Sequence, residues 1–461
     1  MIGILGVAIQ SVQRITYNIK SRSSKVAHNR FIVEQNFNMY FFWWILVSLI
    51  NIFILVDFYR TIYLTDVSTA IVSVSNVLLA VLVRNELIVH LLYRLAVWTS
   101  VKIGHGKYYF NSGVHYIGSV HASCATWGLL WIIINEWQQL GNPSDLLSMS
   151  VSSDPISIAI SSILLTLLVI IILTAISPLR HKFHDTFEIS HRYLGWSCLG
   201  ILVLHQIRFQ FIVTLNQAYP LEALLTNPVL LMLSLIIFSV ALPWMSMECF
   251  SNFRMHCPSE GVLVVSFPGR ADVGTFARIS LDGIEWHSFS VAGTSFSKGT
   301  GESEINLIIG AAGDWTKNLI QQVEKGNLPK RIWVRRVKPP GFMFSINAYS
   351  RVVVIATGAG IAPVIPHLIE NSHKLYIVWI ANKHEQTYGE ELWSFLNSHP
   401  RSNIFDTGVH GRPNVEQLAI EAVRDFRAQA VFCVSNKAVT EKVVKTCLGK
   451  GIPAYGATWD S

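Results

Sequence analysis

The stretch Arg351–Glu370, "RVVVIATGAGIAPVIPHLIE", decides the fold of the C-terminal part of the chain. It starts with an unbroken apolar run, passes through a glycine-rich turn at residues 357–363 and continues as an apolar helical pattern. Unbroken apolar runs are typical of strands that are buried on both faces of a parallel sheet. Glycines between such a strand and a helix let backbone amides approach a pyrophosphate, which the helix N-terminus stabilises. The stretch therefore predicts a dinucleotide-binding α/β domain.

The same pattern recurs toward the C-terminus and changes toward the N-terminus. "KLYIVWIANKHEQTYGEELWSFL" and "AQAVFCVSNKAVTEKVVKTCL" repeat the order strand, turn, helix, which predicts an α/β nucleotide-binding domain over residues 350–461. Residues 253–345 instead show short alternating segments between glycines and prolines, such as "GVLVVSFPG", "GTFARISL" and "EINLIIGAAG". This alternation predicts a small antiparallel β-barrel.

The N-terminal half has the composition of a membrane domain. The whole chain is 51% hydrophobic and only 14% charged, and its apolar residues concentrate before about Met247. Six segments approach the roughly 20 residues needed to cross a bilayer. They are Tyr40–Leu64, Val67–Val83, Val114–Ile134, Pro155–Ser177, Tyr193–Val213 and Pro228–Met247. We therefore expect an N-terminal segment over residues 1–38, followed by a six-span α-helical bundle over residues 39–248.

Charged residues between the expected spans predict an orientation. Lysine and arginine occupy the N-terminal segment and the loops after the second and fourth spans, whereas Glu136, Asp145 and Asp154 follow the third. The positive-inside rule then places both termini and the C-terminal half in the cytosol, at a plasma membrane or an internal membrane. The first residues lack a basic start with a small-residue cleavage site, so no removable signal peptide is expected.

Composition also argues against two classes of function. The net charge of +7 does not indicate nucleic-acid binding, because the basic residues form no single stripe or block. The six cysteines show no CxxC or CxxxC spacing, which argues against a zinc site and a disulfide framework. A lipid bilayer is the partner that the composition predicts.

Four histidines in the third and fifth expected spans are candidate ligands of haem iron. His191 and His205 are fourteen residues apart, which in an ideal helix gives ~21 Å of rise and nearly four full turns. Both rings then face the same way, as two stacked haems require, although boundary histidines also occur without a cofactor. His115 and His121 are six residues apart and differ in facing by ~120°. One haem could be bound by His115 with His191, or by His121 with His205.

Several motifs, taken in order, resemble those of NADPH oxidases and ferric reductases. "IEWHSFSVAG" looks like the flavin-binding strand of that family, "GAAGDWTKNL" like its "GDWT" segment and "GAGIAP" like its nicotinamide turn. "HGRPN" at His410–Asn414 and then Cys433 follow in the same order, and "VRNEL" after the second span matches more loosely. The chain most resembles a branch of fungal membrane flavoproteins related to ferric reductases. The resemblance implies a ferredoxin-reductase-type module, in which an FAD-binding barrel precedes an NAD(P)-binding domain.

The resemblance implies positions for FAD. The residues that would contact its ribityl chain and isoalloxazine are His287, Ser288, Phe289 and Ser290. The residues that would lie at the flavin pyrophosphate or the domain seam are Asp314, Trp315 and Thr316. Trp459 or Tyr455 would cover the flavin face, and plain packing is the alternative role for Trp315 and Trp459.

The resemblance also implies a nicotinamide nucleotide site, for NADPH or NADH. The residues that would shape it are Gly358, Gly360, Ile361 and Pro363. Cys433 would be the catalytic residue near the nicotinamide ring, with a buried strand cysteine as the alternative.

The sequence departs from the family pattern at several positions. Ser288 replaces a proline, and Gly310 stands where an arginine usually helps to bind the FAD phosphates. A "CVS" turn ending at Ser435 replaces "CGP". Asn382 stands where an arginine reads the 2′-phosphate of NADP, and Lys383 is the nearest cation, so NADPH and NADH both stay open.

These features favour a membrane flavoprotein oxidoreductase. Electrons would pass from cytosolic NAD(P)H through FAD to a membrane haem, or directly to an unknown acceptor at the cytosolic face. One alternative is a haem-free membrane flavoprotein that reduces an intracellular small molecule, which the mismatched His115 and His121 favour. The other is a non-enzymatic regulatory membrane protein, which Gly310 and the "CVS" turn favour.

Overall fold

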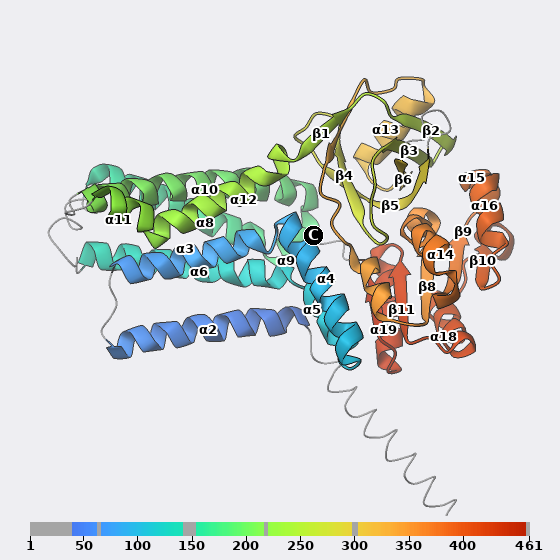
Figure 1. Ribbon diagram of the computed structural model, residues 1–461, viewed down its shortest axis with the longest axis horizontal. Coiled ribbons are helices and arrows are strands. Elements are labelled where there is room, and N and C mark those ends of the chain that lie inside the picture. The colour runs from blue at the N-terminus through green and yellow to red at the C-terminus, as the bar shows by residue number, and fades with distance from the viewer. Residues whose placement is uncertain (1–38, 62–65, 142–153, 216–219, 297–302, 458–461) are drawn as a thin grey trace, which may run out of the picture. The chain divides into compact units, whose positions relative to one another are not determined.

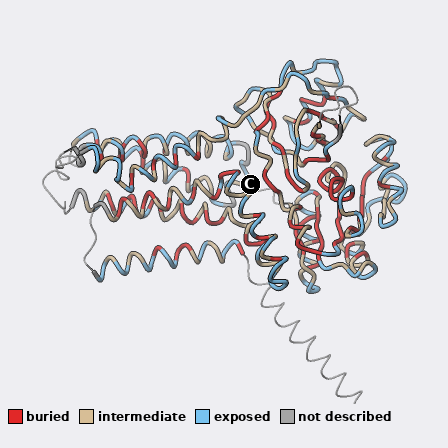
Figure 2. The backbone as a smooth tube through the Cα atoms, viewed as in Figure 1, coloured by how far each residue is buried: buried red, intermediate tan, exposed pale blue. Residues whose placement is uncertain are grey.

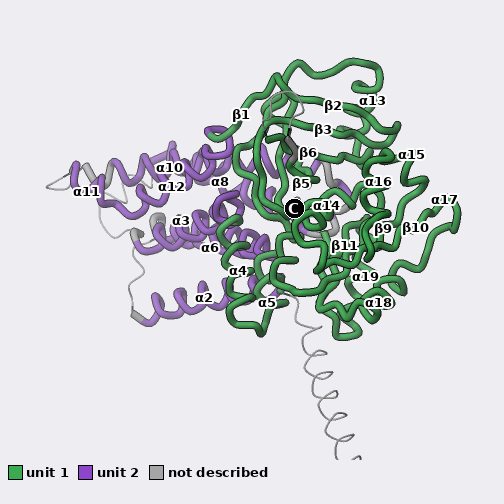
Figure 3. The backbone as a smooth tube through the Cα atoms, turned by 45° about the vertical axis from the view of Figure 1, so that its right-hand side comes forward, with its two compact units in different colours: residues 1–39, 89–115, 246–461 green, residues 40–88, 116–245 purple. Residues whose placement is uncertain are grey.

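The computed structural model describes residues 39–61, 66–141, 154–215, 220–296 and 303–457. The described chain divides into two compact units, coloured separately in Figure 3. Residues 40–88 and 116–245 form one unit, which we call the helical unit. Residues 89–115 and those from 246 onward belong to the other, which we call the sheet unit.

Six long helices build the helical unit and lie alongside one another (Figure 1). They are α2 (Met39–Thr61), α3 (Asp66–Leu82), α6 (Gly118–Gly141), α8 (Pro155–Thr174), α10 (His184–Leu215) and α12 (Pro228–Met245). The short helices α9 (Ser177–Lys182) and α11 (Pro220–Thr226) flank α10. Packed apolar side chains from α3, α10 and α12 form one core cluster, which contains Val74, Val203 and Ile236.

Three to five of the described helices are long and apolar enough to cross a membrane. Helices α2, α8 and α12 satisfy this alone. Two more spans result if each bent pair counts once, α3 with α4 (Glu86–Ile103) and α5 (Lys107–His115) with α6, which bend by 74° and 53°. Helix α10, which contains the fifth expected span, is not among the helices found within the described residues. The described residues thus support three to five of the six expected spans.

Helices α4 and α5 occupy a region that the sequence did not predict to be helical. The sequence predicts a charged loop between the second and third spans, with the third span beginning at Val114. The structure instead forms two helices there, and most of α4 and all of α5 belong to the sheet unit. The Nζ of Lys107 in α5 donates a hydrogen bond to the carbonyl oxygen of Ala348 at 2.8 Å. Part of the expected membrane half therefore packs with the C-terminal half.

The first sheet of the sheet unit has seven antiparallel strands in the order β1-β7-β4-β5-β6-β3-β2. Their bounds are β1 (Met247–Phe250), β2 (Arg254–Ser259), β3 (Val262–Pro268), β4 (Phe276–Ser280), β5 (His287–Phe296), β6 (Ser303–Gly310) and β7 (Ile332–Arg335). Alternate side chains of β6, including Ile305, Leu307 and Ile309, are buried with the inward residues of β3. Helix α13 (Asp314–Glu324) packs Leu319 and Ile320 into the same core. The antiparallel domain predicted from alternation is confirmed, although its first strand begins before residue 253.

The second sheet has five parallel strands in the order β10-β9-β8-β11-β12. The strands are β8 (Val352–Thr357), β9 (Leu375–Ala381), β10 (Ser402–Asp406), β11 (Ala430–Val434) and β12 (Ala454–Gly456). The 3₁₀ helix η1 (Phe342–Ala348) precedes β8. The segments between the strands contain the 3₁₀ helix η2 (Gly358–Val364) and the helices α14 (Ile365–Asn371), α15 (His384–Tyr388), α16 (Glu390–Asn397), α17 (Thr407–His410), α18 (Val415–Phe426) and α19 (Lys437–Gly449).

Both faces of this second sheet are covered. Val352 and Val354 of β8 belong to one hydrophobic cluster, and Val353 and Ile355 belong to another, which includes residues of α18 and α19. The central strands accordingly have the colour of buried residues in Figure 2. The doubly covered parallel sheet predicted from the unbroken apolar run is confirmed.

Candidate functional site

An aromatic stack marks the first expected cofactor site. The Trp315 ring, in the first turn of α13, stacks on the His287 ring of β5, with centroids 4.0 Å apart and planes inclined by 27°. The same indole lies 6.0 Å from the Phe289 ring at 28°. His287 and Phe289 are two residues apart on a strand and therefore share one face. Phe289 and Trp315 also pack against the hydrophobic core of the antiparallel sheet, and we call the three near-parallel rings the aromatic stack.

The other two expected flavin residues lie on the opposite face of β5. Ser288 pairs with Arg278 of β4 and Ser290 pairs with Phe276, whereas Phe289 pairs with the fully buried Ala277. Residues directly opposite each other in an antiparallel pair have neighbouring side chains. Ser288 and Ser290 therefore point toward the face of Arg278. The sequence did not predict a role for Arg278, because its register with the flavin strand is visible only in the folded sheet.

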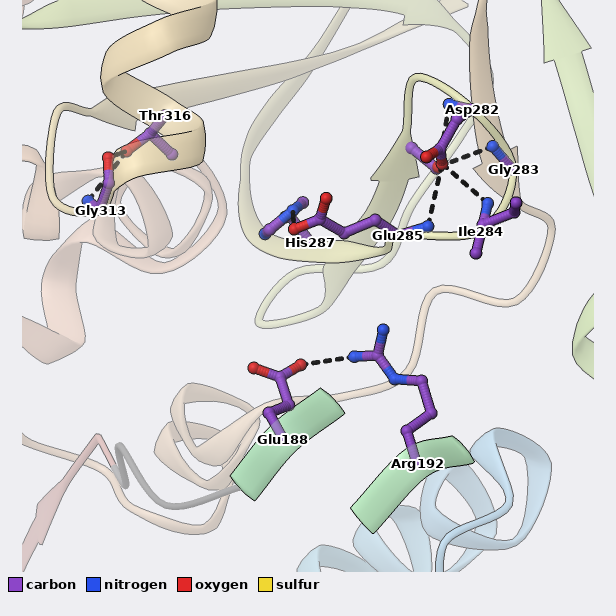
Figure 4. A network of polar contacts seen from close by, with 10 residues as sticks. Glu188, Arg192, Asp282, Gly283, Ile284, Glu285, His287, Gly313 and Thr316 are labelled. Carbon is purple, nitrogen blue, oxygen red and sulfur yellow. Dashed lines mark hydrogen bonds and ion pairs between the residues drawn. The ribbon is translucent and has the colours of Figure 1, made fainter. Parts of the chain in front are cut away.

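The turn before β5 fixes the position of His287 (Figure 4). The Asp282 Oδ1 accepts hydrogen bonds from the backbone N–H groups of Ile284 and Glu285 at 2.8 and 2.9 Å. Partial burial acts to raise the pKa of Asp282, but these hydrogen bonds outweigh it and lower the pKa below its ordinary value. A Glu285 oxygen lies 3.0 Å from the Nε2 of His287. The ionised Asp282 thus holds the turn that presents the His287 ring.

The start of α13 supplies backbone amides and one exposed cation, Lys317, whose Nζ lies 3.9 Å from the Asp314 Oδ1. The Thr316 hydroxyl accepts a hydrogen bond from the Gly313 N–H at 3.0 Å and donates one to the Gly313 carbonyl at 2.9 Å. Thr316 therefore closes the first helical turn, while the Asp314 side chain is 94% exposed. A Cβ at Gly310 would lie 3.0 Å from the Ala359 Cβ, so an arginine at this position would push η2 away. Of the residues that the resemblance implies for the flavin pyrophosphate, Thr316 thus caps the helix, and the first N–H groups of α13 are of the kind that binds anions.

The glycine turn lies where the strand order of the second sheet reverses. Strands β8 and β11 are neighbours, but β8 is followed by β9 on one side and β11 is followed by β12 on the other. Ligands of open α/β sheets bind at such a reversal of the strand order. The Thr357 Oγ1, at the end of β8, lies 2.7 Å from the Ser435 Oγ just beyond β11. These two hydroxyls are therefore candidate nucleotide contacts that the sequence did not predict.

The residues of the turn are fixed by packing. Gly358 has a positive φ of 55°, and its carbonyl oxygen accepts a hydrogen bond from the Trp379 Nε1 at 3.0 Å. A Cβ at Gly360 would lie 2.5 Å from the Val434 carbonyl oxygen, which only glycine avoids. Ile361 and Pro363 are buried and shape the turn from within the core. The turn itself is the 3₁₀ helix η2, so the α-helix expected directly after the glycines begins only with α14.

Cys433 does not occupy the position expected of a catalytic residue. Its side chain is fully buried in the cluster that contains Val443 and Cys447 of α19, and its Sγ lies 3.9 Å from the Thr440 Oγ1. Burial raises the pKa of the Cys433 thiol to about 12. A neutral thiol packed under the helix layer has the geometry of the alternative role, a buried strand cysteine.

Tyr455 also lies away from the position expected of it. Its ring stacks on Phe432 with centroids 4.8 Å apart, and its hydroxyl lies 2.6 Å from the Tyr349 hydroxyl. The Tyr108 ring of α5 lies 5.6 Å from the Tyr455 ring. Tyr455 is therefore a core residue rather than a cover for the flavin, and Trp459 lies outside the described residues.

Lys383, the nearest cation to the expected 2′-phosphate site, directly precedes α15. It has a positive φ of 47°, and its side chain is exposed. Its backbone N–H donates a hydrogen bond to the Oδ1 of Asp406, the last residue of β10, at 3.1 Å. A carboxylate that the sequence did not predict therefore lies beside the expected cation.

The histidines of the helical unit form pairs other than those expected. The His121 ring of α6 lies 6.3 Å from the His191 ring of α10, and the His121 Nδ1 lies 2.9 Å from the Ala80 carbonyl oxygen. A hydrogen bond from Nδ1 to a carbonyl leaves Nε2 free to bind a metal. His121 and His191 are therefore two of the expected ligands whose rings lie close together.

The other two histidines fit no second haem. The His205 Nε2 lies 3.3 Å from the Glu136 Oε1 and 3.3 Å from the Ser161 Oγ, so its neighbours are a carboxylate and a hydroxyl. His115 belongs to the sheet unit, where its ring lies 6.0 Å from Phe342. Within the helical unit, the expected pairing of His121 with His205 therefore differs from the structure, which brings the His121 ring close to His191. Among the described residues, no group of three or more histidine, cysteine or acidic side chains is arranged to hold a metal ion.

Comparisons with known proteins identify fungal reductases as relatives. A family model described as the C-terminal domain of adenylate-forming reductase 03009 matches residues 342–461. Adenylate-forming reductase 03009 of Coprinopsis cinerea is 31% identical over 402 residues, which are 85% of this chain and 37% of that protein. Adenylate-forming reductase 06235 of the same fungus is 30% identical over 460 residues, which are 97% of this chain and 41% of that protein.

Solved structures similar to part of this chain are reductases as well. The ferredoxin reductase in carbazole 1,9a-dioxygenase matches with a TM-score of 0.34 and 13% identity, over 46% of this chain and 69% of that one. The ferredoxin-NADP⁺ reductase of Plasmodium falciparum matches with a TM-score of 0.32 and 16% identity, over 46% of this chain and 96% of that one. The chain is thus similar along most of its length to adenylate-forming reductases, and it spans about two fifths of the length of the curated relatives it matches.

Proposed function

We propose that this chain is a membrane-attached NAD(P)H-dependent flavoprotein oxidoreductase. One observation carries the proposal: a single unit combines an aromatic stack on an antiparallel sheet with a glycine turn at the switch point of a parallel sheet. Bound FAD supplies the ability to accept a hydride from a reduced nicotinamide and to release its electrons one at a time. The similarity to proteins named reductases supports the same reaction class.

The residues of the chain bind and orient both cofactors in this proposal. His287, Phe289 and Trp315 hold the flavin ring by stacking, and the amides at the start of α13 face its pyrophosphate. Thr357 and Ser435 donate hydrogen bonds to the nicotinamide nucleotide beside the turn at Gly358. Stacking rings and hydroxyls position the cofactors, and the chemistry remains that of the flavin.

Titration of the purified full-length protein with FAD tests the flavin site. Quenching of flavin fluorescence should show saturable binding, and Trp315→Ala should weaken that binding at least tenfold because it removes the ring that stacks on His287. Trp393→Ala is the matched control, since this tryptophan lies on α16 of the nucleotide-binding domain. Equal FAD affinity for the Trp315 and Trp393 variants would contradict the proposed site.

The proposed attachment to the bilayer uses the six long helices as spans, with the sheet unit in the cytosol. Helix α4 supports a membrane surface beside this unit, because Leu91, Leu95, Trp98 and Val101 form an exposed apolar stripe at helical spacing. An amphipathic helix of this kind lies in the plane of the membrane interface. Nitroxide spin labels on Leu91→Cys and on the exposed Gln429→Cys, with the protein in nanodiscs, test this placement. Lipid-soluble oxygen should relax the spin at position 91, and a water-soluble nickel complex should relax the spin at position 429. Equal relaxation by nickel at both positions would contradict the proposal.

A haem between His121 and His191 is the proposed membrane acceptor of the electrons. The 6.3 Å separation of the two rings supports it, whereas the acidic partner of His205 argues against a second haem. Reduced purified protein should show haem bands that His121→Ala and His191→Ala abolish and His205→Ala retains. Loss of the bands in His205→Ala alone would contradict this assignment.

The second candidate is a haem-free reductase of an intracellular small molecule. The carboxylate and hydroxyl beside His205 favour it, because they surround one of the expected haem ligands with polar partners instead of a second histidine. Purified protein with flavin bands and no haem bands would support this candidate. Folded protein that binds neither chromophore would support the non-enzymatic reading.

A further inference from the structure

A carboxylate lies at the rim of the parallel sheet where β9 ends. Asp406 is the last residue of β10 and pairs with Ala381 of β9. Its Oδ1 accepts hydrogen bonds from the backbone N–H groups of Lys383 at 3.1 Å and Gly408 at 2.7 Å. Its Oδ2 lies 3.9 Å from the Nδ1 of His384, and 29% of the Asp406 side chain stays exposed. The carboxylate is therefore fixed in place and still accessible to a ligand.

A side-chain amide lies next to this carboxylate. Asn382 follows β9 directly, and a Cβ at Gly408 would collide with its Oδ1 and contact the Oδ1 of Asp406. Both side chains therefore border Gly408, which has to remain a glycine. The left-handed backbone of Lys383, with a φ of 47°, turns its N–H toward Asp406 and leaves its own side chain exposed. Asn382 and Asp406 together form what we call the rim pair.

The charge of the rim pair is negative at neutral pH. Hydrogen bonds from the backbone N–H groups of Lys383 and Gly408 hold the pKa of Asp406 below its ordinary value. Burial lowers the pKa of His384, so this imidazole is neutral and adds no positive charge. Of Lys383, His384 and Gly408, which all contact Asp406, the exposed Lys383 alone carries a positive charge.

The rim pair lies where a dinucleotide presents its adenosine ribose. The glycine turn follows β8, and β9 is the neighbouring strand on the side away from the switch point. In folds of this class, an acidic residue about 20 residues beyond the glycines binds the ribose 2′-hydroxyl, whereas an arginine accommodates a 2′-phosphate. Here the end of β9 carries Asn382, and β10 delivers the carboxylate to the same place.

We propose that Asn382 and Asp406 bind the unphosphorylated ribose of NADH and select against NADPH. The inference rests on the proposed function, because it names the nucleotide used at the same site. The carboxylate accepts hydrogen bonds from the ribose hydroxyls, and the amide both donates and accepts. A 2′-phosphate provides no hydroxyl donor at that position and places negative charge against a fixed carboxylate. Discrimination therefore comes from an unmade hydrogen bond together with repulsion between like charges.

The test compares two pairs of nucleotides on the full-length FAD-loaded protein. Calorimetric titration with adenosine monophosphate and with its 2′-phosphorylated form measures binding alone. Anaerobic flavin reduction by NADH and by NADPH measures turnover. We expect the unphosphorylated member of each pair to be favoured at least tenfold. Asp406→Asn should bring both ratios near one, because it should strengthen binding of the 2′-phosphorylated monophosphate and speed flavin reduction by NADPH. Asparagine keeps the backbone hydrogen bonds of Asp406 but carries no charge.

Control variants separate the rim pair from general effects. Asp425→Asn removes an exposed carboxylate that pairs with Arg424 at 3.2 Å on α18, and it should leave both ratios unchanged. Asp406→Ser provides the same test if the asparagine variant unfolds, because serine also caps the turn. Lys383→Ala should leave weak binding of the 2′-phosphorylated ligand as weak as before.

Three results would overturn the inference: equal or tighter binding of the 2′-phosphorylated ligand, ratios that Asp406→Asn leaves unchanged, or binding of neither monophosphate. Loss of 2′-phosphate binding in Lys383→Ala would assign this position to NADPH and count against the rim pair as well. Flavin that neither NADH nor NADPH reduces would contradict the proposed function instead. The binding ratio would still decide the specificity of the ribose site in that case.

Discussion

Gly360 provides the sharpest test of the packing around the glycine turn. A methyl group added at this position would lie 2.5 Å from the Val434 carbonyl oxygen, 3.1 Å from its Cγ1 and 3.2 Å from its carbonyl carbon. Two of these atoms are backbone atoms at the end of β11, so they cannot rotate away. Gly360→Ala must therefore separate η2 from β11, and overpacking of this kind typically costs about 1–3 kcal/mol.

Thermal unfolding of the sheet unit in the full-length protein measures this cost. A loss of 1 kcal/mol lowers the Tm by roughly 2–4 °C for a domain of 150–250 residues. The same variant should slow flavin reduction by nucleotide, because the hydroxyls of Thr357 and Ser435 lie beside the displaced turn. Gly261→Ala is the matched control, since no atom lies within 4 Å of its added Cβ. A Gly360 variant as stable as the Gly261 variant would refute the close approach of η2 to β11.

Three further predictions follow from the same geometry. Iodoacetamide should label the exposed Cys249 in native protein and leave Cys433 unlabelled, because burial keeps the pKa of the Cys433 thiol near 12. Cys433→Ala should retain flavin reduction, and a variant that no longer reduces flavin would restore the catalytic role of this cysteine. Trp379→Phe should lower the free energy of unfolding, measured with urea, by roughly 1–3 kcal/mol, because it leaves the Gly358 carbonyl without its hydrogen-bond donor. An unchanged urea midpoint would count against that hydrogen bond. Burial raises the pKa of Tyr349 to about 12 and raises that of Tyr455 well above its ordinary value of 10.0. The stability that these two side chains contribute is therefore complete below pH 10 and falls as the pH rises toward 12. Tyr349→Phe should flatten this alkaline decrease, and an equally steep decrease would contradict the burial of the pair.

The parts of the fold that the sequence predicted are those where pattern and burial agree. The run Val352–Ala356 is buried at every position, so its apolar letters alone identify a central strand. The alternation of β6 likewise matches one buried and one partly exposed face. The strand β1 was missed because the apolar composition of α12 continues to its first residue, Met247. Helices α4 and α5 were missed because Arg94, Lys102 and Lys107 are also typical of a loop between spans.

Site residues were predicted less well where a side chain's direction depends on register. Cys433 sits on a strand without polar alternation, so the sequence does not tell which face its thiol joins. The break between α5 and α6 separates His115 from His121, which an ideal continuous helix does not allow for. Asp406 ends a short, half-buried strand without a strong pattern, and only the sheet order places it beside Asn382. The resemblance implied flavin contacts for His287 and Phe289 and a place at the pyrophosphate or the domain seam for Trp315, whereas the contact between these three rings is visible only in the structure.

Anaerobic addition of NADH to the FAD-loaded full-length protein tests the central claim most directly. If the sheet unit binds both cofactors, the absorption of the oxidised flavin should disappear once an equimolar amount of reduced nucleotide has been added. Flavin that stays oxidised with both NADH and NADPH, in protein shown to be folded and saturated with FAD, would contradict it.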